Sequence, residues 1–188
     1  MPVLDIITEP DPRLARDSGR LRAKSEPVTQ IDADLLAFAS DMHETLDHAE
    51  GVGLAAPQVG VLQRLVAIHM PADYLGEGND DLRITLINPE IVKAGGQNCD
   101  TEGCLSFPDM WGEVRRYTSV IVRAQDDQGR NIKIRARGPL ARILQHEIDH
   151  LDGIMYFDRM DDIQDLYRAT REDLRNAQAM REATEKAT

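Results

Sequence analysis

The feature that most constrains this chain is a pair of histidines, His146 and His150, with Glu147 directly after the first. Residues four apart on a helix project from the same face, one turn above the other. Two neutral imidazole nitrogens in that arrangement can bind a divalent metal, and the carboxylate beside them can carry a proton. Two exposed histidines and a salt-bridging glutamate would produce the same five-residue pattern. A metal site therefore needs further ligands elsewhere in the chain.

A helix that carries these histidines is expected between Gly138 and Gly153, because glycine and proline at its start and glycine at its end favour helix boundaries. Apolar residues recur at helical spacing along one side, while the histidines and Glu147 occupy another. The apolar residues are Leu140, Leu144, Ile148 and Leu151. A helix that is apolar on one face and carries ligands on another is expected inside the molecule.

Apolar periodicity also predicts a second helix and several strands. The second helix begins at Asp32 as its N-cap and ends before Gly51 and Gly53. Strands are expected at residues 64–69, 83–88, 91–92, 118–123 and 131–135. Pro89 is expected to end the second of these strands, and a last helix is expected from about Asp161. Helices and strands in this order predict an α+β fold.

The chain has 188 residues, which suit one domain with its own core, residues 1–188, of which 161–188 would be a C-terminal helix and tail. Its net charge of −11 argues against a general nucleic-acid-binding surface, which needs a basic face. No run of about 18 apolar residues is present to span a membrane. The first residues lack the pattern of a signal or transit peptide, so we expect a cytoplasmic location.

The two cysteines, Cys99 and Cys104, are too few for a disulfide framework. Cys104 lies in a loop-like segment between a glycine and the dipeptide Leu-Ser. A lone cysteine is more often a small buried apolar residue than a ligand. With His146 and His150, however, Cys104 would complete a three-ligand site with a fourth position for water, the layout of catalytic metal sites.

Three segments together resemble the signature of peptide deformylases, in that family's order. They are GVGLAAPQ at residues 51–58, EGCLS at 102–106 and QHEIDHLDG at 145–153. The similarity extends over most of the chain, from roughly Leu4 to Phe157. Peptide deformylases remove the formyl group from the N-terminal methionine of nascent bacterial and organellar polypeptides. The resemblance implies a central metal-bearing helix surrounded by mostly antiparallel β-sheets, with one helix in the N-terminal half and one at the C-terminus.

The resemblance also implies a metal site and a mechanism. The ligands of one divalent metal would be Cys104, His146 and His150. The family typically uses Fe2+, and Ni2+, Co2+ or Zn2+ also suit such ligands. Water on the metal would attack the formyl carbon, with Glu147 as general base and then acid. The metal, the side-chain amide of Gln58 and the backbone N–H of Leu105 would stabilise the oxyanion. The family uses one cysteine here, so Cys99 is not expected to be a ligand.

The substrate implied is an N-formylmethionyl nascent peptide. Gly51 and Gly53 would let its backbone lie alongside the first segment as an added strand. Val52, Leu105 and Ile143 are candidates for lining the methionine pocket, although an ordinary place in the core accounts for them equally well.

Other expectations about partners follow from the tail. Residues 161–188 carry five basic and seven acidic side chains, a net charge of −2, which does not favour an RNA-binding helix. Transient association with the ribosome, as in some deformylases, is therefore disfavoured but stays open. We expect no direct nucleic-acid specificity, no membrane binding and a monomer.

Two other functions stay open from the residues alone. A metallopeptidase would share the His146–Glu147–His150 pattern, but no downstream histidine or glutamate stands out as its third ligand. A non-catalytic metal-stabilised or ribosome-associated module would need neither Glu147 nor Gln58. The resemblance also implies that Arg116 meets the Glu102 carboxylate, and this ion pair is expected to brace the cysteine segment. Asp149 could orient a histidine, form a salt bridge or cap the helix.

Overall fold

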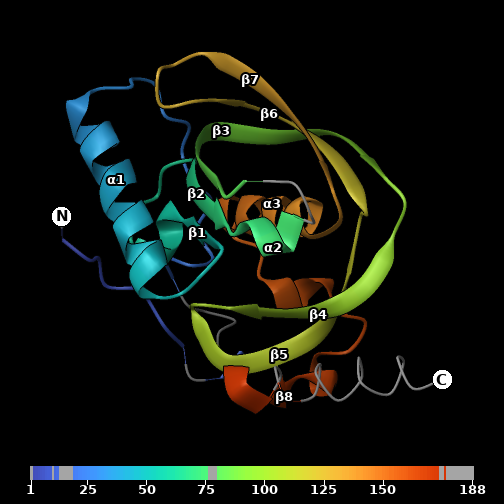
Figure 1. Ribbon diagram of the computed structural model, residues 1–188. Coiled ribbons are helices and arrows are strands. Elements are labelled where there is room, and N and C mark those ends of the chain that lie inside the picture. Colours follow the sequence, from blue (N-terminus) through green and yellow to red (C-terminus); the bar gives the residue numbers. More distant parts are fainter. Residues whose placement is uncertain (1, 10, 13–18, 76–79, 174–175, 177–188) are drawn as a thin grey trace.

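The computed structural model describes residues 2–9, 11–12, 19–75, 80–173 and 176. These residues form an α+β fold in which helix α3 lies between two antiparallel sheets (Figure 1). The larger sheet has the strand order β1-β2-β3-β6-β7, and the smaller has the order β4-β5-β8. The expected α+β class with a central helix is confirmed.

The strands of the larger sheet are β1 (Gly53–Ala55), β2 (Leu65–Met70), β3 (Leu82–Gly95), β6 (Ser119–Gln125) and β7 (Asn131–Arg137). Those of the smaller sheet are β4 (Asn98–Cys104), β5 (Phe107–Arg116) and β8 (Tyr167–Arg168). The α-helices are α1 (Ala33–His48), α2 (Ala72–Leu75) and α3 (Gly138–Leu151). Short 3-10 helices are η2 (Ala56–Val59), η3 (Tyr156–Arg159) and η4 (Ile163–Asp165). None of the described helices is long and apolar enough to cross a membrane.

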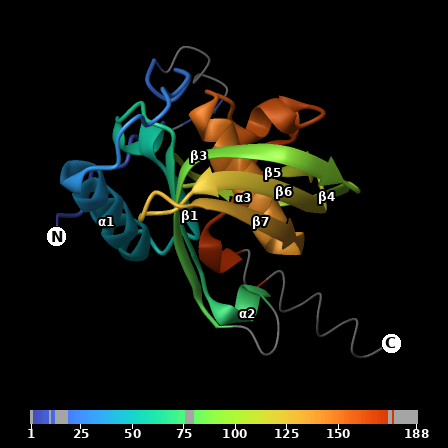
Figure 2. The ribbon, with the colours of Figure 1, turned by 90° about the horizontal axis from the view of Figure 1, so that it is seen from above.

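Helix α1 starts and packs as its sequence predicts. The Asp32 side chain accepts a hydrogen bond from the Leu35 N–H at 2.9 Å and so caps the helix. Its apolar face packs with residues of β1 and β2 in one core cluster, which includes Leu35, Ala39, Met42, Leu46, Leu54 and Leu65. Figure 2 shows α1 on one side of β1 and α3 on the other. The first strand is therefore covered on both faces.

Helix α3 is the buried centre of the fold. Every residue from Leu144 to Leu151 is buried. Its apolar side packs on the larger sheet in a second core cluster. This cluster joins Ala141, Leu144, Ile148 and Leu151 of the helix to Val66 and Ile68 of β2 and to Val120 and Val122 of β6. The predicted helix, its boundaries and its interior position are confirmed. The predicted hairpin that precedes it is β6 and β7.

The predicted strand break at Pro89 is wrong. Strand β3 continues through it, and the pairing with β6 shifts register between Ile87 and Glu90. Asn88 adopts a positive φ of 53° there, and its side chain bonds both backbone groups of Val28 at 2.8 Å. A bulge of this kind accommodates a residue without an N–H, so the proline interrupts the pairing and not the strand.

The cysteine segment and the C-terminal region also differ from expectation. The segment at 102–106 is not a loop, because it is the end of β4 and the tight turn into β5. The helix expected from Asp161 is wrong over its first ten residues, where η4 and β8 occur and β8 pairs with Met110 and Trp111. Helical residues are found at 171–173 and 176, and the rest of that prediction lies outside the described residues.

Candidate metal centre

The three predicted ligands come from two elements that meet inside the fold. Cys104 is the last residue of β4, and His146 and His150 lie one turn apart on α3. Their donor atoms all lie within 4.8 Å of one another. The His150 Nε2 atom is 3.2 Å from His146 Nε2 and 3.3 Å from Cys104 Sγ. Sulfur and nitrogen ligands of one tetrahedral transition metal lie about 3.3 to 3.6 Å apart, so the donors fit such a metal.

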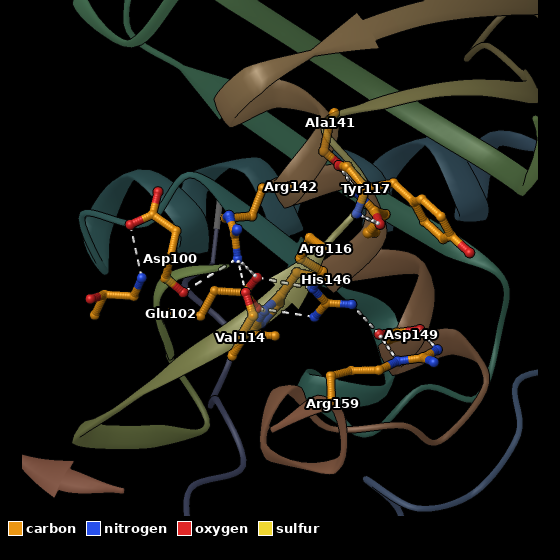
Figure 3. A network of polar contacts seen from close by, with 12 residues as sticks. Asp100, Glu102, Val114, Arg116, Tyr117, Ala141, Arg142, His146, Asp149 and Arg159 are labelled. Atoms are coloured by element: carbon orange, nitrogen blue, oxygen red, sulfur yellow. Dashed lines mark hydrogen bonds and ion pairs between the residues drawn. The ribbon is translucent and has the colours of Figure 1, made fainter. Parts of the chain in front are cut away.

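The tautomer of His146 follows from its contact with Glu102. The Glu102 carboxylate accepts from Arg116 Nε at 2.9 Å and from Arg116 NH2 at 3.0 Å, and from Arg142 NH1 at 2.7 Å (Figure 3). Its Oε2 atom lies 2.9 Å from His146 Nδ1. An ionised carboxylate is an acceptor only, so the Nδ1 atom carries a hydrogen, and Nε2 is the atom that faces the cluster and could bind a metal.

Glu102 stays ionised although it is buried. Burial by itself would raise its pKa, but the hydrogen bonds from His146 and Arg116 lower that pKa well below its usual range. The expected ion pair between Glu102 and Arg116 is therefore present, with both side chains almost fully buried. Asp149, whose role was open, forms ion pairs with Arg116 and Arg159, and it is connected to His146 through Arg116 and Glu102.

Glu147 lies in the same turn of α3 as the candidate ligands, and its carboxylate is buried. Its Oε2 atom is buried and has no hydrogen-bond partner among the described residues. The side chain packs against the backbone of Gly53, where an added Cβ would lie 2.7 Å from Glu147 Cδ and nearer still to Oε1. Burial raises the pKa of Glu147 to about 7. A carboxyl with that pKa can exchange a proton near neutral pH.

Gln58 is held by η2 with its amide directed at the ligand cluster. Its Oε1 atom accepts from the Ala55 N–H at 2.8 Å, which fixes the orientation of the carboxamide. Its Nε2 atom lies 3.5 Å from Cys104 Sγ and donates to Ser106 Oγ at 3.2 Å. Leu105 occupies the turn directly after Cys104, so its N–H is next to a ligand. Donors from two separate motifs are thus brought beside the metal position.

The residues predicted to bind the peptide lie along β1 and α3. β1 is an edge strand of the larger sheet and begins at Gly53, so it has one side on which the sheet can be extended. Gly51 lies against the Leu105 side chain, since an added Cβ would be 2.8 Å from Leu105 Cδ1. Val52 and Ile143 are partly buried and pack against the core of the larger sheet. Their predicted place in a methionine pocket stays a prediction.

Several residues of the site were missed from the sequence. Tyr156 stacks on the His146 ring, with centroids 6.1 Å apart and an interplanar angle of 19°. Arg142 lies four residues before His146 on α3, a spacing that could have suggested a shared partner. Ser106 and Arg159 carried no signal of their own. Cys99 is exposed on β4 and outside the cluster, as expected.

Comparison with known proteins gives one consistent result. A family model described as polypeptide deformylase matches residues 3–165. A peptide deformylase of Thermomicrobium roseum is 48% identical over 162 residues, which cover 86% of this chain and 88% of that protein. One from Symbiobacterium thermophilum is 50% identical over 159 residues, covering 85% and 67%. The crystal structure of peptide deformylase from Ehrlichia chaffeensis in complex with actinonin has a TM-score of 0.77 at 34% identity, covering 87% of this chain and 92% of that one.

Proposed function

The chain belongs to the polypeptide deformylase family of hydrolases, and we propose on that premise that it removes the formyl group from the N-terminal formylmethionine of nascent polypeptides and releases formate. One observation carries the proposal: a buried glutamate with an unpartnered oxygen lies beside three metal-ligand donors. A purely structural metal site needs no such carboxylate, because its ligands alone provide its stability.

The residues of the site divide the chemistry between them. A divalent metal held by Cys104, His146 and His150 would polarise the formyl oxygen and lower the pKa of water. Glu147 accepts the proton of the attacking water and delivers it to the leaving amine, which then departs neutral. Gln58 Nε2 and the Leu105 N–H donate to the oxyanion, and each such donor typically contributes about 3 kcal/mol to the transition state.

Peptide binding would use the edge of the larger sheet. The backbone of the substrate would pair alongside β1, next to Gly51 and Gly53. Val52, Leu105 and Ile143 would contact the methionine side chain. Selection of formyl over acetyl would rest on a space too small for one more methyl group. Such a difference is worth only about 1 to 3 kcal/mol in a pocket, so exclusion at the metal would contribute as well.

We further propose that the native metal is Fe2+, that the protein is a monomer and that it meets its substrate in the cytoplasm as chains leave the ribosome. A thiolate and two imidazoles also suit Ni2+, Co2+ and Zn2+. Ferrous iron beside a thiolate is sensitive to oxygen. We therefore expect activity to be lost in air and preserved after exchange for Ni2+.

One sample, purified without oxygen, tests the proposal. Metal analysis and formate release from formyl-Met-Ala should give one metal per chain and turnover, while an unformylated peptide should not be cleaved at an internal bond. Glu147→Ala should keep the metal and lose activity. The exposed carboxylate of Glu90, which pairs with Arg123, supplies the control Glu90→Gln. Full activity in Glu147→Ala would refute the assigned role, and cleavage of internal peptide bonds would favour the metallopeptidase.

A further inference from the structure

A chain of charged side chains leads from the surface to the metal ligand His146. It runs from Arg159 on η3 through Asp149 on α3 and Arg116 on β5 to Glu102 on β4 (Figure 3). Glu102 then bonds His146 Nδ1. Four separate elements of the fold are thus joined by alternating positive and negative groups. Among these described side chains, the hydrogen bond to a candidate ligand is the one that Glu102 forms with His146.

The outer pair, Arg159 and Asp149, is geometrically well defined. Arg159 Nε donates to Asp149 Oδ2 at 3.1 Å, and Arg159 NH2 donates to Oδ1 at 2.7 Å. This is the bidentate fork that arginine and carboxylate groups favour. The Asp149 side chain is only 11% exposed, whereas that of Arg159 is 45% exposed. Arg159 is therefore the solvent-exposed outer end of this series of charged side chains.

Arg116 is the link between the two carboxylates. Its side chain is 3% exposed, and its donors are shared between Glu102 and Asp149. A buried guanidinium that lost one carboxylate would be left partly unpaired, which is costly in a low-dielectric interior. It would then move toward the remaining partner or toward water. Either movement would change the donors that hold Glu102 and, through Glu102, the imidazole of His146.

A cavity lies beside this link. It measures about 130 Å³ and is lined by Arg116, Asp149 and Arg159, with Arg115 and Gln145 among its other walls. A space of that size with charged side chains in its wall can hold water. With Arg159 in place, its Nε and NH2 groups both donate to Asp149 and cover one side of that carboxylate. Without Arg159, water would take over one side of Asp149 and weaken its hold on Arg116.

We propose that Arg159 and Asp149 are positioning residues that set how tightly the metal is held, by fixing Arg116 and so the Glu102–His146 contact. This inference rests on the metal site of the proposed function and assigns the residues no contact with substrate. Buried ion pairs contribute little stability compared with apolar packing. Positioning of His146 therefore accounts for this series of charged side chains better than stabilisation of the fold does.

Arg159→Gln and Asp149→Asn test the proposal, with Arg115→Gln as the matched control. Arg115 lines the same cavity but pairs with Asp161, which is 82% exposed. The readout is Co2+ affinity by chelator competition, together with the visible spectrum of the Co2+-loaded protein. Partners of metal-bound histidines typically contribute about 10- to 100-fold in affinity. We expect about tenfold weaker binding in Asp149→Asn, about threefold to tenfold in Arg159→Gln, and no change in the control.

Two further variants separate positioning from general destabilisation. Arg159→Gln added to Asp149→Asn should weaken metal binding no further, because both act through one path. Arg159→Lys keeps the positive charge but cannot form the bidentate contact with Asp149. It should therefore bind Co2+ more tightly than Arg159→Gln and less tightly than the wild-type protein. Co2+ affinity and spectrum equal to wild type in both single variants would overturn the proposal, as would additive losses in the double variant. A wild-type protein that bound Co2+ but released no formate would refute the proposed function instead.

Discussion

Gly53→Ala would displace the Glu147 carboxylate, the proposed proton carrier, without removing it. The added Cβ would lie 2.7 Å from Glu147 Cδ and 2.8 Å from Cγ, whereas ordinary contacts begin at 3.4 Å. The carboxylate must therefore withdraw by at least about 0.7 Å. A misplacement of about 1 Å at a reacting centre typically costs 100-fold in rate. We expect kcat to fall by roughly 30- to 100-fold, an increase of about 2 to 2.7 kcal/mol in the barrier.

The assay is formate release at saturating formyl-Met peptide, since kcat then reports the positioned base and not peptide binding. Metal content and the midpoint of thermal unfolding are measured on the same sample. Gly95→Ala is the control, because a Cβ there would lie 3.5 Å from Ser119 Oγ, an ordinary contact. A folded, metal-loaded Gly53→Ala protein with wild-type kcat would show that the contact between Gly53 and Glu147 does not position the proton carrier.

Four further outcomes are expected. Gln58→Ala should lower kcat by about 100-fold in steady-state assays, with less effect on KM. Burial raises the pKa of Glu147 to about 7, and a nearby dication favours its charged form. Because the base must be ionised, kcat/KM should rise with pH, with the midpoint of the rise at or below about pH 7. A midpoint above about pH 8 would contradict this. The pKa of Glu102 is lowered in the folded protein, because hydrogen bonds from a histidine and an arginine outweigh the effect of burial. The ionised carboxylate therefore stabilises the fold above about pH 4.3, the usual pKa of glutamate in an unfolded chain. This stabilisation is lost as the pH falls toward the lower pKa of the folded state. Urea unfolding of the metal-free protein should show this loss, and Glu102→Gln should reduce it. Arg171 donates to the Glu50 carbonyl at 2.9 Å, next to the glycines proposed to bind peptide, so Arg171→Ala should raise KM about two- to fivefold at unchanged kcat.

The helices were predictable because their signals are local. Asp32 precedes an apolar stripe at helical spacing, and the structure shows it capping α1. Helix α3 combines an apolar stripe with Gly138 and Pro139 at its start and Gly153 at its end, and its apolar face together with its ligand-bearing face predicts a position inside the fold. Both signals depend on residues a few positions apart, which the helix itself brings together.

The smaller sheet was not predictable in the same way. Strand β4 (Asn98–Cys104) is polar, with Glu102 as its one buried residue, and nothing in its composition indicates a strand. It is a strand because β5 pairs with it along its length, from Asn98 with Arg116 to Cys104 with Phe107. Long-range pairing of this kind overrides weak local preference. The same holds for β8, which pairs with β5 where a helix was expected.

The sequence by itself determined the donor set and its chemistry: two histidines on one helical face, a glutamate between them and a cysteine in a separate motif. Apart from the Glu102–Arg116 pair, which the family resemblance implied, only the tertiary structure decided how these groups are held. The tautomer of His146 depends on Glu102, and Glu102 on arginines from β5 and α3. The unpartnered oxygen of Glu147 depends on burial against Gly53. Such effects arise from charges and surfaces far apart in the chain, so no local pattern can contain them.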